Sequence, residues 1–201
     1  MIAGLVLAAG TSSRMGRQKL LLPLGGRPLV AHAVDAALRA GCLEDVVVVV
    51  GRDAEDVERA VGSAGVVRSA RNERFETGQA SSLATGIGAM REDAEAFVVL
   101  LGDQPTVRPD AIAAVATAFR DGAGPIVQAA YSGRPAHPTL LGRGTWPDLM
   151  ALSGDVGARA VISRHPGRRT LVEIGGDPPA DVDTEDDYRR LLHGIPHDHP
   201  S

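Results

Sequence analysis

The sequence has little cysteine and no excess of basic residues, and each shortage excludes a class of protein. Cys42 is the one cysteine among 201 residues, so no disulfide can form within the chain, and a reducing cytoplasm is the expected compartment. We expect Cys42 to be a small buried hydrophobe rather than a reactive thiol. The formal net charge of -4 argues against a nucleic-acid partner, whose phosphates favour a basic surface. It leaves room for a small anionic ligand bound by a few local cations.

The sequence also lacks a long apolar segment. Residues 1–7 are apolar, but no basic segment precedes them and a glycine loop soon follows, so we expect neither a signal peptide nor a membrane span. The content of 44% hydrophobic and 23% charged residues is typical of a globular protein, and the length fits one α/β domain. We predict a single domain over residues 1–193, followed by a flexible tail over residues 194–201 that is rich in proline and histidine.

Short apolar runs alternate along the chain with segments of helical period. Buried strands are expected at residues 2–9, 46–50, 97–101 and 126–130, because these runs are apolar throughout instead of alternating in polarity. Helices are expected at residues 29–40, 54–61, 109–119 and 188–192, the last after a capping box of Thr184 and Asp187. This order predicts an α/β fold with a mostly parallel, mixed sheet and helices on both faces. Ligands of such sheets bind beyond the carboxyl ends of the strands.

The loop after the first strand has the composition of a phosphate site. Gly10 allows a tight turn whose N–H groups can point at a phosphate, while Arg14 and Lys19 add positive charge. A solvated turn with two surface cations is the alternative. The spacing excludes a Walker A loop, because Lys19 does not follow a glycine and Leu20 stands where Ser or Thr is needed. It also excludes the Gly-x-Gly-x-x-Gly pattern of dinucleotide-binding loops.

Two later segments of the sequence contain carboxylates that could bind a metal, one at Asp103 and one at Asp181 and Asp183. Asp103 lies two residues after the apolar run 97–101, where an unpaired carboxylate would be unfavourable and a Mg²⁺ ion would stabilise it. Asp181 and Asp183 would lie on one face of an extended chain and offer a second carboxylate. Taken alone, Asp103 could instead be a turn or capping residue, and the later acids could simply begin a helix.

Seven segments resemble the molybdenum-cofactor cytidylyltransferase family, which belongs to the molybdopterin nucleotidyltransferase-like NTP transferases. They occur in order across nearly the whole chain, and their order makes the resemblance specific. The segments are 7–16 (LAAGTSSRMG), 19–24 (KLLLPL), 78–83 (GQASSL), 101–105 (LGDQP), 133–138 (GRPAHP), 154–159 (GDVGAR) and 181–186 (DVDTED).

The resemblance implies a Rossmann-like nucleotidyltransferase fold, with the nucleotide bound by the N-terminal half and the acceptor by the C-terminal half. It implies Mg²⁺-dependent transfer of CMP from CTP to a molybdopterin-type phosphate, with release of pyrophosphate. A molybdenum hydroxylase would then be a partner that receives the product.

The resemblance also implies roles for individual residues. Arg14, Lys19 and Asp103 would form the catalytic set, with Arg14 and Lys19 on the triphosphate, and Asp103 and Asp183 would bind the metal. The remaining assignments place Leu7, Ala8, Ala9 and Gly10 at the base and ribose, Ser81 at the nucleotide, and His137 and Asp155 at the pterin. The guanylyl branch tends to carry glycine at the position of Ala9, so alanine there favours CTP.

Several alternatives remain open at this point. The same chemistry could use GTP or another phosphorylated acceptor, such as a sugar phosphate or a cofactor precursor. The protein could instead bind a nucleotide or cofactor without catalysis, although the presence of Lys19, Asp103 and Asp183 together argues against this. His137 could be a structural turn residue, and the segment Gly154-Asp155-x-Gly157 could be only a cap for a helix that ends near His165.

Overall fold

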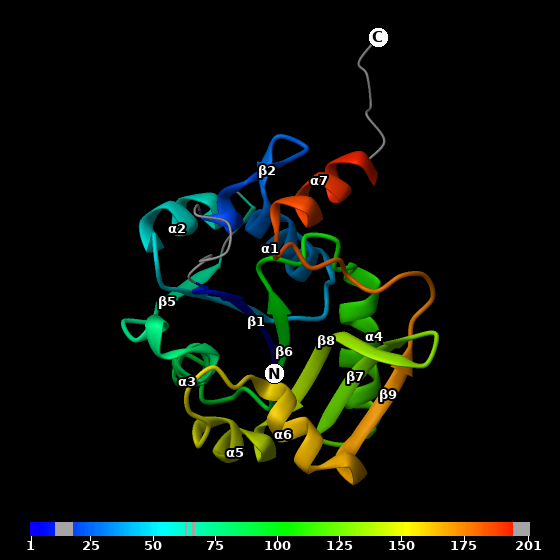
Figure 1. Cartoon of the computed structure of the whole chain (residues 1–201). Coiled ribbons are helices and arrows are strands. Elements are labelled where there is room, and N and C mark those ends of the chain that lie inside the picture. The colour runs from blue at the N-terminus through cyan, green and yellow to red at the C-terminus, as the bar shows by residue number, and fades with distance from the viewer. Residues whose placement is uncertain (11–17, 63, 66, 195–201) are drawn as a thin grey trace.

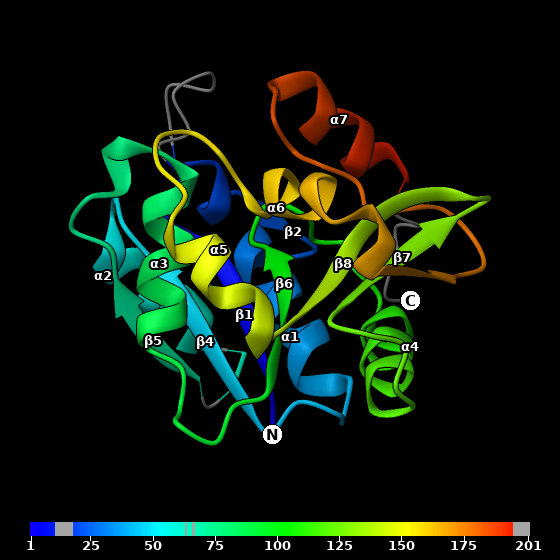
Figure 2. The ribbon, with the colours of Figure 1, turned by 90° about the horizontal axis from the view of Figure 1, so that it is seen from below.

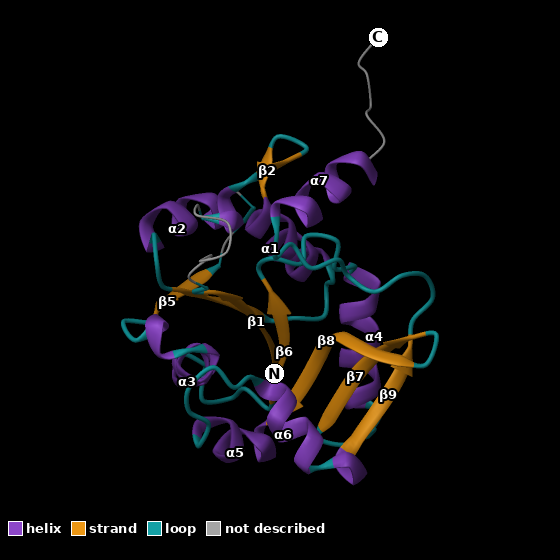
Figure 3. Ribbon diagram, viewed as in Figure 1, coloured by secondary structure: helices purple, strands orange, loops and turns teal. Residues whose placement is uncertain are grey.

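A seven-stranded sheet forms the centre of the computed structural model, which describes residues 1–10, 18–62, 64–65 and 67–194. From one edge to the other its strands are β5 (Arg68–Arg71), β4 (Asp45–Val50), β1 (Ile2–Ala8), β6 (Ala96–Leu101), β8 (Arg134–Gly142), β7 (Ile126–Tyr131) and β9 (Arg169–Glu173). Strand β8 runs antiparallel to β6 and β7, and the other pairings between these described strands are parallel (Figures 1 and 3). The predicted α/β fold with a mostly parallel, mixed sheet is confirmed.

Helices cover both faces of this sheet. One face carries α1 (Leu29–Arg39), α2 (Ala54–Gly62) and α4 (Pro109–Arg120), and the other carries α3 (Gln79–Gly88), α5 (Trp146–Met150) and α6 (Ala158–Arg164) (Figures 1 and 2). Short 3-10 turns span Lys19–Leu21, Phe75–Thr77, Arg143–Thr145 and Pro166–Arg168. Among the residues that the structure describes, no helix has the length and apolarity needed to cross a membrane.

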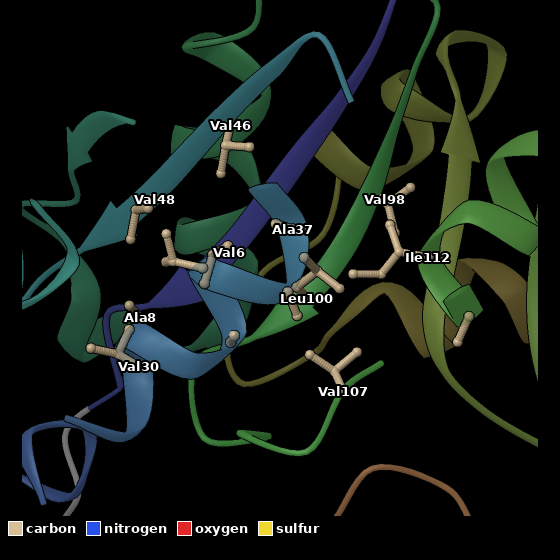
Figure 4. Packing of buried hydrophobic residues seen from close by; sticks show 14 of the residues in the cluster. Val6, Ala8, Val30, Ala37, Val46, Val48, Val98, Leu100, Val107 and Ile112 are labelled. Atoms are coloured by element: carbon tan, nitrogen blue, oxygen red, sulfur yellow. The ribbon is translucent and has the colours of Figure 1, made fainter. Parts of the chain in front are cut away.

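The two covered faces explain why the central strands are apolar throughout. In β1, Val6 packs in the core beneath α1, while its neighbour Leu5 packs in the core beneath α3. Figure 4 shows Val30 of α1 near the end of β1 and Ile112 of α4 beside Val98 of β6. Each side chain of this size contributes about 1.5–3 kcal/mol when fully buried. Burial of side chains on both faces of the sheet therefore holds the central strands in place.

A third apolar cluster joins the end of the described chain to its beginning. Helix α7 (Glu185–Gly194) contributes Tyr188, which packs with Val182 against residues of and near the hairpin of β2 (Pro23–Leu24) and β3 (Arg27–Pro28). The hairpin side of the cluster consists of Leu22, Leu24 and Leu29. The Tyr188 hydroxyl also donates to the Pro23 carbonyl at 2.5 Å. This cluster holds α7 next to the segment that follows Lys19 (Figure 1).

The predicted capping box of α7 is present. The Asp187 N–H donates to Thr184 Oγ1 at 3.2 Å, and Asp187 Oδ2 accepts from the Thr184 hydroxyl at 2.7 Å and the Thr184 N–H at 2.8 Å. The bonds that the Asp187 carboxylate accepts lower its pKa to about 2, and the bond from the Thr184 hydroxyl has the largest effect. Gly194 belongs to α7 and not to the predicted tail, whose remaining residues 195–201 lie outside the described chain.

The four predicted strands and the helices at residues 29–40, 54–61 and 109–119 are confirmed to within one or two residues. Cys42 differs slightly from expectation, because it is only partly buried. Burial still raises the pKa of its thiol, which fits the predicted inert side chain.

Candidate functional site

A pocket of about 520 Å³ lies at the carboxyl ends of the central strands. The end of β1 supplies Leu7, Ala9 and Gly10, and the end of β6 supplies Leu101 and Asp103. The opposite wall consists of residues 75–79, at the start of α3, together with Ser82 and Asp155. Lys19 and Asp183 complete the lining near Asp103. The pocket therefore lies where a mostly parallel sheet normally binds its ligand.

Lys19 lies between the two carboxylates that were predicted to bind a metal. Its Nζ donates to Asp103 Oδ2 at 2.7 Å and to Asp183 Oδ1 at 2.9 Å. The Lys19 side chain is 12% exposed, compared with 22% for Asp103 and 49% for Asp183. Burial by itself lowers the pKa of the ammonium, but the attraction and hydrogen bonds of both carboxylates outweigh it, so the pKa lies above 10.5. Lys19 is therefore charged at neutral pH.

The backbone holds these two carboxylates side by side. The Val182 N–H donates to the Asp103 carbonyl at 3.0 Å, so the residue before Asp183 is bonded to Asp103 itself. The Gln104 amide donates to Asp181 Oδ1 at 2.7 Å. Asp181 thus orients the segment, while Asp183 is the carboxylate that lies in the pocket. The alternative that Asp181 and Asp183 only begin a helix does not account for the ion pair between Asp183 and Lys19.

Asp103 and Asp183 fit a divalent cation. Both carboxylates already converge on one cationic group, the Lys19 ammonium. Mg²⁺ binds proteins through one or two carboxylates and completes its octahedron with phosphate oxygens and water. No cluster of three or more acidic, histidine or cysteine ligands occurs in the part of the chain that the structure describes. A metal at this place would therefore take its remaining ligands from substrate and water.

A close backbone contact forms the opposite wall. Gly78 has φ +107°, and a Cβ at this position would lie 2.4 Å from the carbonyl carbon of Gly154. The Ala80 N–H donates to the Gly154 carbonyl at 3.2 Å, and the Gln79 N–H makes a longer contact of 3.4 Å with Asp155 Oδ1. Asp155 thus faces the N-terminus of α3, where a carboxylate is favourable. The alternative that residues 154–157 cap the helix ending near His165 holds for Gly157, which is the N-cap residue of α6, whereas Asp155 faces α3 instead.

Two of the predicted nucleotide contacts lie elsewhere. Ser81 is outside the pocket lining. Its hydroxyl donates to the Gly78 carbonyl at 2.8 Å and accepts a hydrogen bond from the Asn72 side chain at 2.8 Å. Its neighbour Ser82 lines the pocket instead. The side chain of Ala8 is 1% exposed in the core beneath α1, so only its backbone faces the site end of β1. A role for Ser81 in nucleotide binding stays a prediction.

His137 belongs to β8 and is also outside the pocket lining. Burial lowers its pKa below 6.5, and a hydrogen bond to the Val99 carbonyl, with Asp181 and Asp103 nearby, opposes part of that change. The imidazole is therefore neutral at pH 7. Its Nδ1 is buried without a hydrogen-bond partner among the described residues. The predicted position of His137 at the acceptor stays untested.

Sequence reasoning missed the pocket residues just before Gly78, namely Phe75, Glu76 and Thr77. These residues carry no recognisable phosphate or metal pattern, and Gly78 is the one signal of a special backbone conformation there. Arg14, predicted to contact the triphosphate, lies outside the described residues. The described lining contains more acidic than basic side chains, with Glu76 and Asp155 added to the two central carboxylates. An anionic ligand would therefore need additional positive charge, as a bound metal provides.

Comparison with known proteins gives a family. Residues 4–170 match the family described as MobA-like NTP transferase domain. The chain is 33% identical over 201 residues to the nicotine blue oxidoreductase of Paenarthrobacter nicotinovorans, a match that covers 95% of this chain and 96% of that protein.

Solved structures give the same fold. Rv0371c from Mycobacterium tuberculosis H37Rv matches with a TM-score of 0.83 and 31% identity, over 97% of this chain and 100% of that one. A manganese complex of the same protein matches with a TM-score of 0.80 and 30% identity, over 96% and 99% of the two chains. A nucleotidyl transferase from Methanothermobacter thermautotroptrophicus matches with a TM-score of 0.78 and 28% identity, over 96% of each chain. The chain belongs to the MobA-like NTP transferase domain family and is a nucleotidyltransferase of that type.

Proposed function

We propose that this protein transfers CMP from CTP to the phosphate of a molybdopterin-type acceptor and releases pyrophosphate. The observation that carries the proposal is the convergence of Asp103 and Asp183 on Lys19, at 2.7 and 2.9 Å, in the pocket at the strand ends. Two carboxylates and an ammonium supply what a triphosphate and its metal need. They do not form the nucleophile–base pair that covalent catalysis requires.

The reaction makes few chemical demands on the chain. An oxygen of the acceptor phosphate attacks the α-phosphorus of CTP, and the bond from that phosphorus to the bridging oxygen breaks as pyrophosphate leaves. The attacking oxygen is already anionic, so no strong general base is needed. Alignment of the reactants and stabilisation of the charge on the leaving group then account for the rate.

The described residues divide these tasks. Asp103 and Asp183 would hold Mg²⁺, which neutralises phosphate charge when bound. Lys19, charged at neutral pH, stabilises negative charge on the phosphates. The ends of β1 and β6 hold these groups on a rigid sheet, which favours precise alignment. Arg14 would add a second cation from the loop that lies outside the described residues.

Ala9 supports the choice of CTP. Ala9 lines the pocket at the end of β1. Its Cβ lies close to Gly51, because a Cβ added to Gly51 would be 3.0 Å from the Ala9 Cβ. A methyl group at this position narrows the space at the strand end, which favours a pyrimidine over the larger purine ring. For the acceptor, Asp155 and His137 are the proposed contacts, and a molybdenum hydroxylase is the proposed recipient of the product.

Pyrophosphate release by the purified chain tests this function. The protein is mixed with Mg²⁺, a molybdopterin-type acceptor and each nucleoside triphosphate in turn. We expect release with CTP that depends on the acceptor. Release with GTP and none with CTP would contradict the cytidylyl assignment. Tight CTP binding without release would instead indicate another phosphorylated acceptor.

Two variants give this assay a matched control. Asp103→Ala should abolish pyrophosphate release while the far-UV circular dichroism spectrum stays unchanged. Asp93→Ala removes an acid of the same kind that is 59% exposed in an ion pair with Arg91, outside the pocket, and should retain full activity. Full activity of Asp103→Ala would remove this residue from the metal site.

An oxidation–reduction reaction in the same pocket is a second candidate. The 33% identity with a protein named as an oxidoreductase, across 95% of this chain, favours it. Such a reaction would pass two electrons from a reduced nicotinamide cofactor to an acceptor substrate, and it breaks no phosphoanhydride bond. Oxidation of NADPH by the purified protein with an added quinone dye as acceptor, without any nucleoside triphosphate and retained by Asp103→Ala, would support this candidate against nucleotidyl transfer.

A further inference from the structure

The Asp187 carboxylate makes more hydrogen bonds than a helix cap requires. Its Oδ1 accepts from Arg190. Its Oδ2 accepts first from the Thr184 N–H, as in an ordinary capping box, second from the Thr184 hydroxyl, and third from the N–H of Asp183 at 3.2 Å. Asp183 precedes α7, which begins at Glu185. The third bond therefore lies outside the helix and ends on the residue whose side chain contacts Lys19.

The backbone of Asp183 is thus held from both sides. On the preceding side, the Val182 N–H bonds to the Asp103 carbonyl at 3.0 Å, and the Val182 side chain is fully buried. On the following side, Asp187 holds the N–H groups of Asp183 and Thr184. The direction of the Asp183 side chain follows from the backbone at its Cα. The Asp183 carboxylate is 49% exposed, so few packing contacts are available to orient it.

We propose that Asp187 is a positioning residue that orients Asp183 as a ligand for the divalent cation. The proposal rests on the metal role of Asp103 and Asp183 in the proposed function. Asp187 acts through the backbone and does not itself contact the cation. Groups that hold metal ligands in place affect metal affinity although they touch no metal, and their loss commonly weakens binding by about 10–100-fold.

Binding of Mn²⁺ to the purified full chain, without nucleotide, tests this role. Free Mn²⁺ is measured by electron paramagnetic resonance for the wild type and for Asp187→Ala, Asp187→Asn and Asp186→Ala. Asp187→Ala should weaken binding by about tenfold. Asp187→Asn keeps an oxygen acceptor in the same place and should stay within about threefold of the wild type. Asp186→Ala removes an equal charge from the same turn, where Asp186 pairs with Arg189 at 3.7 Å, and should bind like the wild type.

The variants separate position from charge and from helix stability. Equal weakening by Asp187→Asn and Asp187→Ala would overturn the proposal, because loss of charge would then explain both. Wild-type affinity of Asp187→Ala would overturn it as well. If Asp187→Ala loses far-UV ellipticity, Asp187→Glu takes its place with the same expected weakening, because glutamate at this position retains a capping box while its extra methylene moves the carboxylate relative to the Asp183 N–H.

Asp103→Ala distinguishes failure of this inference from failure of the proposed function. If Asp103→Ala loses Mn²⁺ binding while Asp187→Ala retains it, the metal site stands and the positioning role is wrong. If Asp103→Ala binds Mn²⁺ like the wild type, the carboxylate pair is not the metal site, and both proposals fail.

Discussion

Replacing Lys19 with methionine should strengthen divalent-metal binding while it weakens catalysis. The Lys19 ammonium lies 2.7 Å from Asp103 and 2.9 Å from Asp183, between the carboxylates that a metal would need. A metal that enters must displace it. Methionine has a similar length and no charge, so the carboxylates of Lys19→Met would face the metal without this competitor.

The expected size of the effect follows from exposure. A charge-assisted hydrogen bond contributes about 1.5–3 kcal/mol when shielded, and an exposed ion pair contributes about 0.2–1 kcal/mol. Asp103 is 22% exposed and Asp183 is 49% exposed, so the two contacts fall between these limits. A total of about 2 kcal/mol corresponds to Mn²⁺ binding that is roughly thirtyfold tighter in Lys19→Met. Turnover should fall by about 10²–10³-fold, because charge on the leaving group loses its ammonium.

The Mn²⁺ affinity is measured from free Mn²⁺ by electron paramagnetic resonance. Turnover is measured by pyrophosphate release on the same samples. The control is Arg27→Met, which removes a cation from the nearby hairpin, where Arg27 lies 3.8 Å from Asp35. It should change neither quantity. Unchanged or weaker Mn²⁺ binding by Lys19→Met would refute the view that the lysine and the metal compete for one place.

Three further predictions concern the pocket walls and α7. Gly78→Ala should lower stability by about 2–3 kcal/mol, and the melting temperature by about 4–12 °C, because of its positive φ and the contact with Gly154; Gly88→Ala, whose Cβ meets nothing within 4 Å, should not lower it. In kinetic assays with each triphosphate, Ala9→Gly should raise kcat/KM for purine relative to pyrimidine nucleotides. The control Ala8→Gly, altered on the other face of β1, should keep the wild-type preference. Since the folded-state pKa of Asp187 is about 2, below 3.8, its stabilisation of α7 is fully present above pH 3.8 and is lost as the pH falls towards 2. An acid titration by circular dichroism should therefore show a loss of helix in this range that is absent from Asp187→Ala.

The central strands could be predicted from sequence because burial on both faces leaves a simple apolar pattern. Strand β8 could not, since two prolines and a histidine interrupt its first half, and those residues read as a turn. Strand β9 has only two apolar residues among its five positions, and it lies at the sheet edge. Helix α3 contains Gly86 and Gly88, which weaken its helical pattern.

The candidate site was predictable in its chemistry but not in its contacts. Asp103 could be placed because it lies two residues after a strand whose end lies at the pocket. The contact of Lys19 with Asp183 depends on how α7 packs on the β2–β3 hairpin, which no local pattern encodes. The choice between Ser81 and Ser82 depends on where α3 begins, and the unusual backbone at Gly78 decides that.

The bond between Lys19 and Asp183 joins residues that are 164 positions apart, and this separation determines when the site forms during synthesis. The sheet gains its last described strand, β9, at Glu173, before Asp183 leaves the ribosome. A nascent chain can therefore pair its strands and bury its core while it still lacks one of the two carboxylates. Chains are synthesised from the N-terminus at about 5–20 residues per second, so the ten residues from Glu173 to Asp183 take about 0.5–2 s. Metal binding would follow sheet formation as a late event, and it would report that the segment up to α7 has joined the folded sheet.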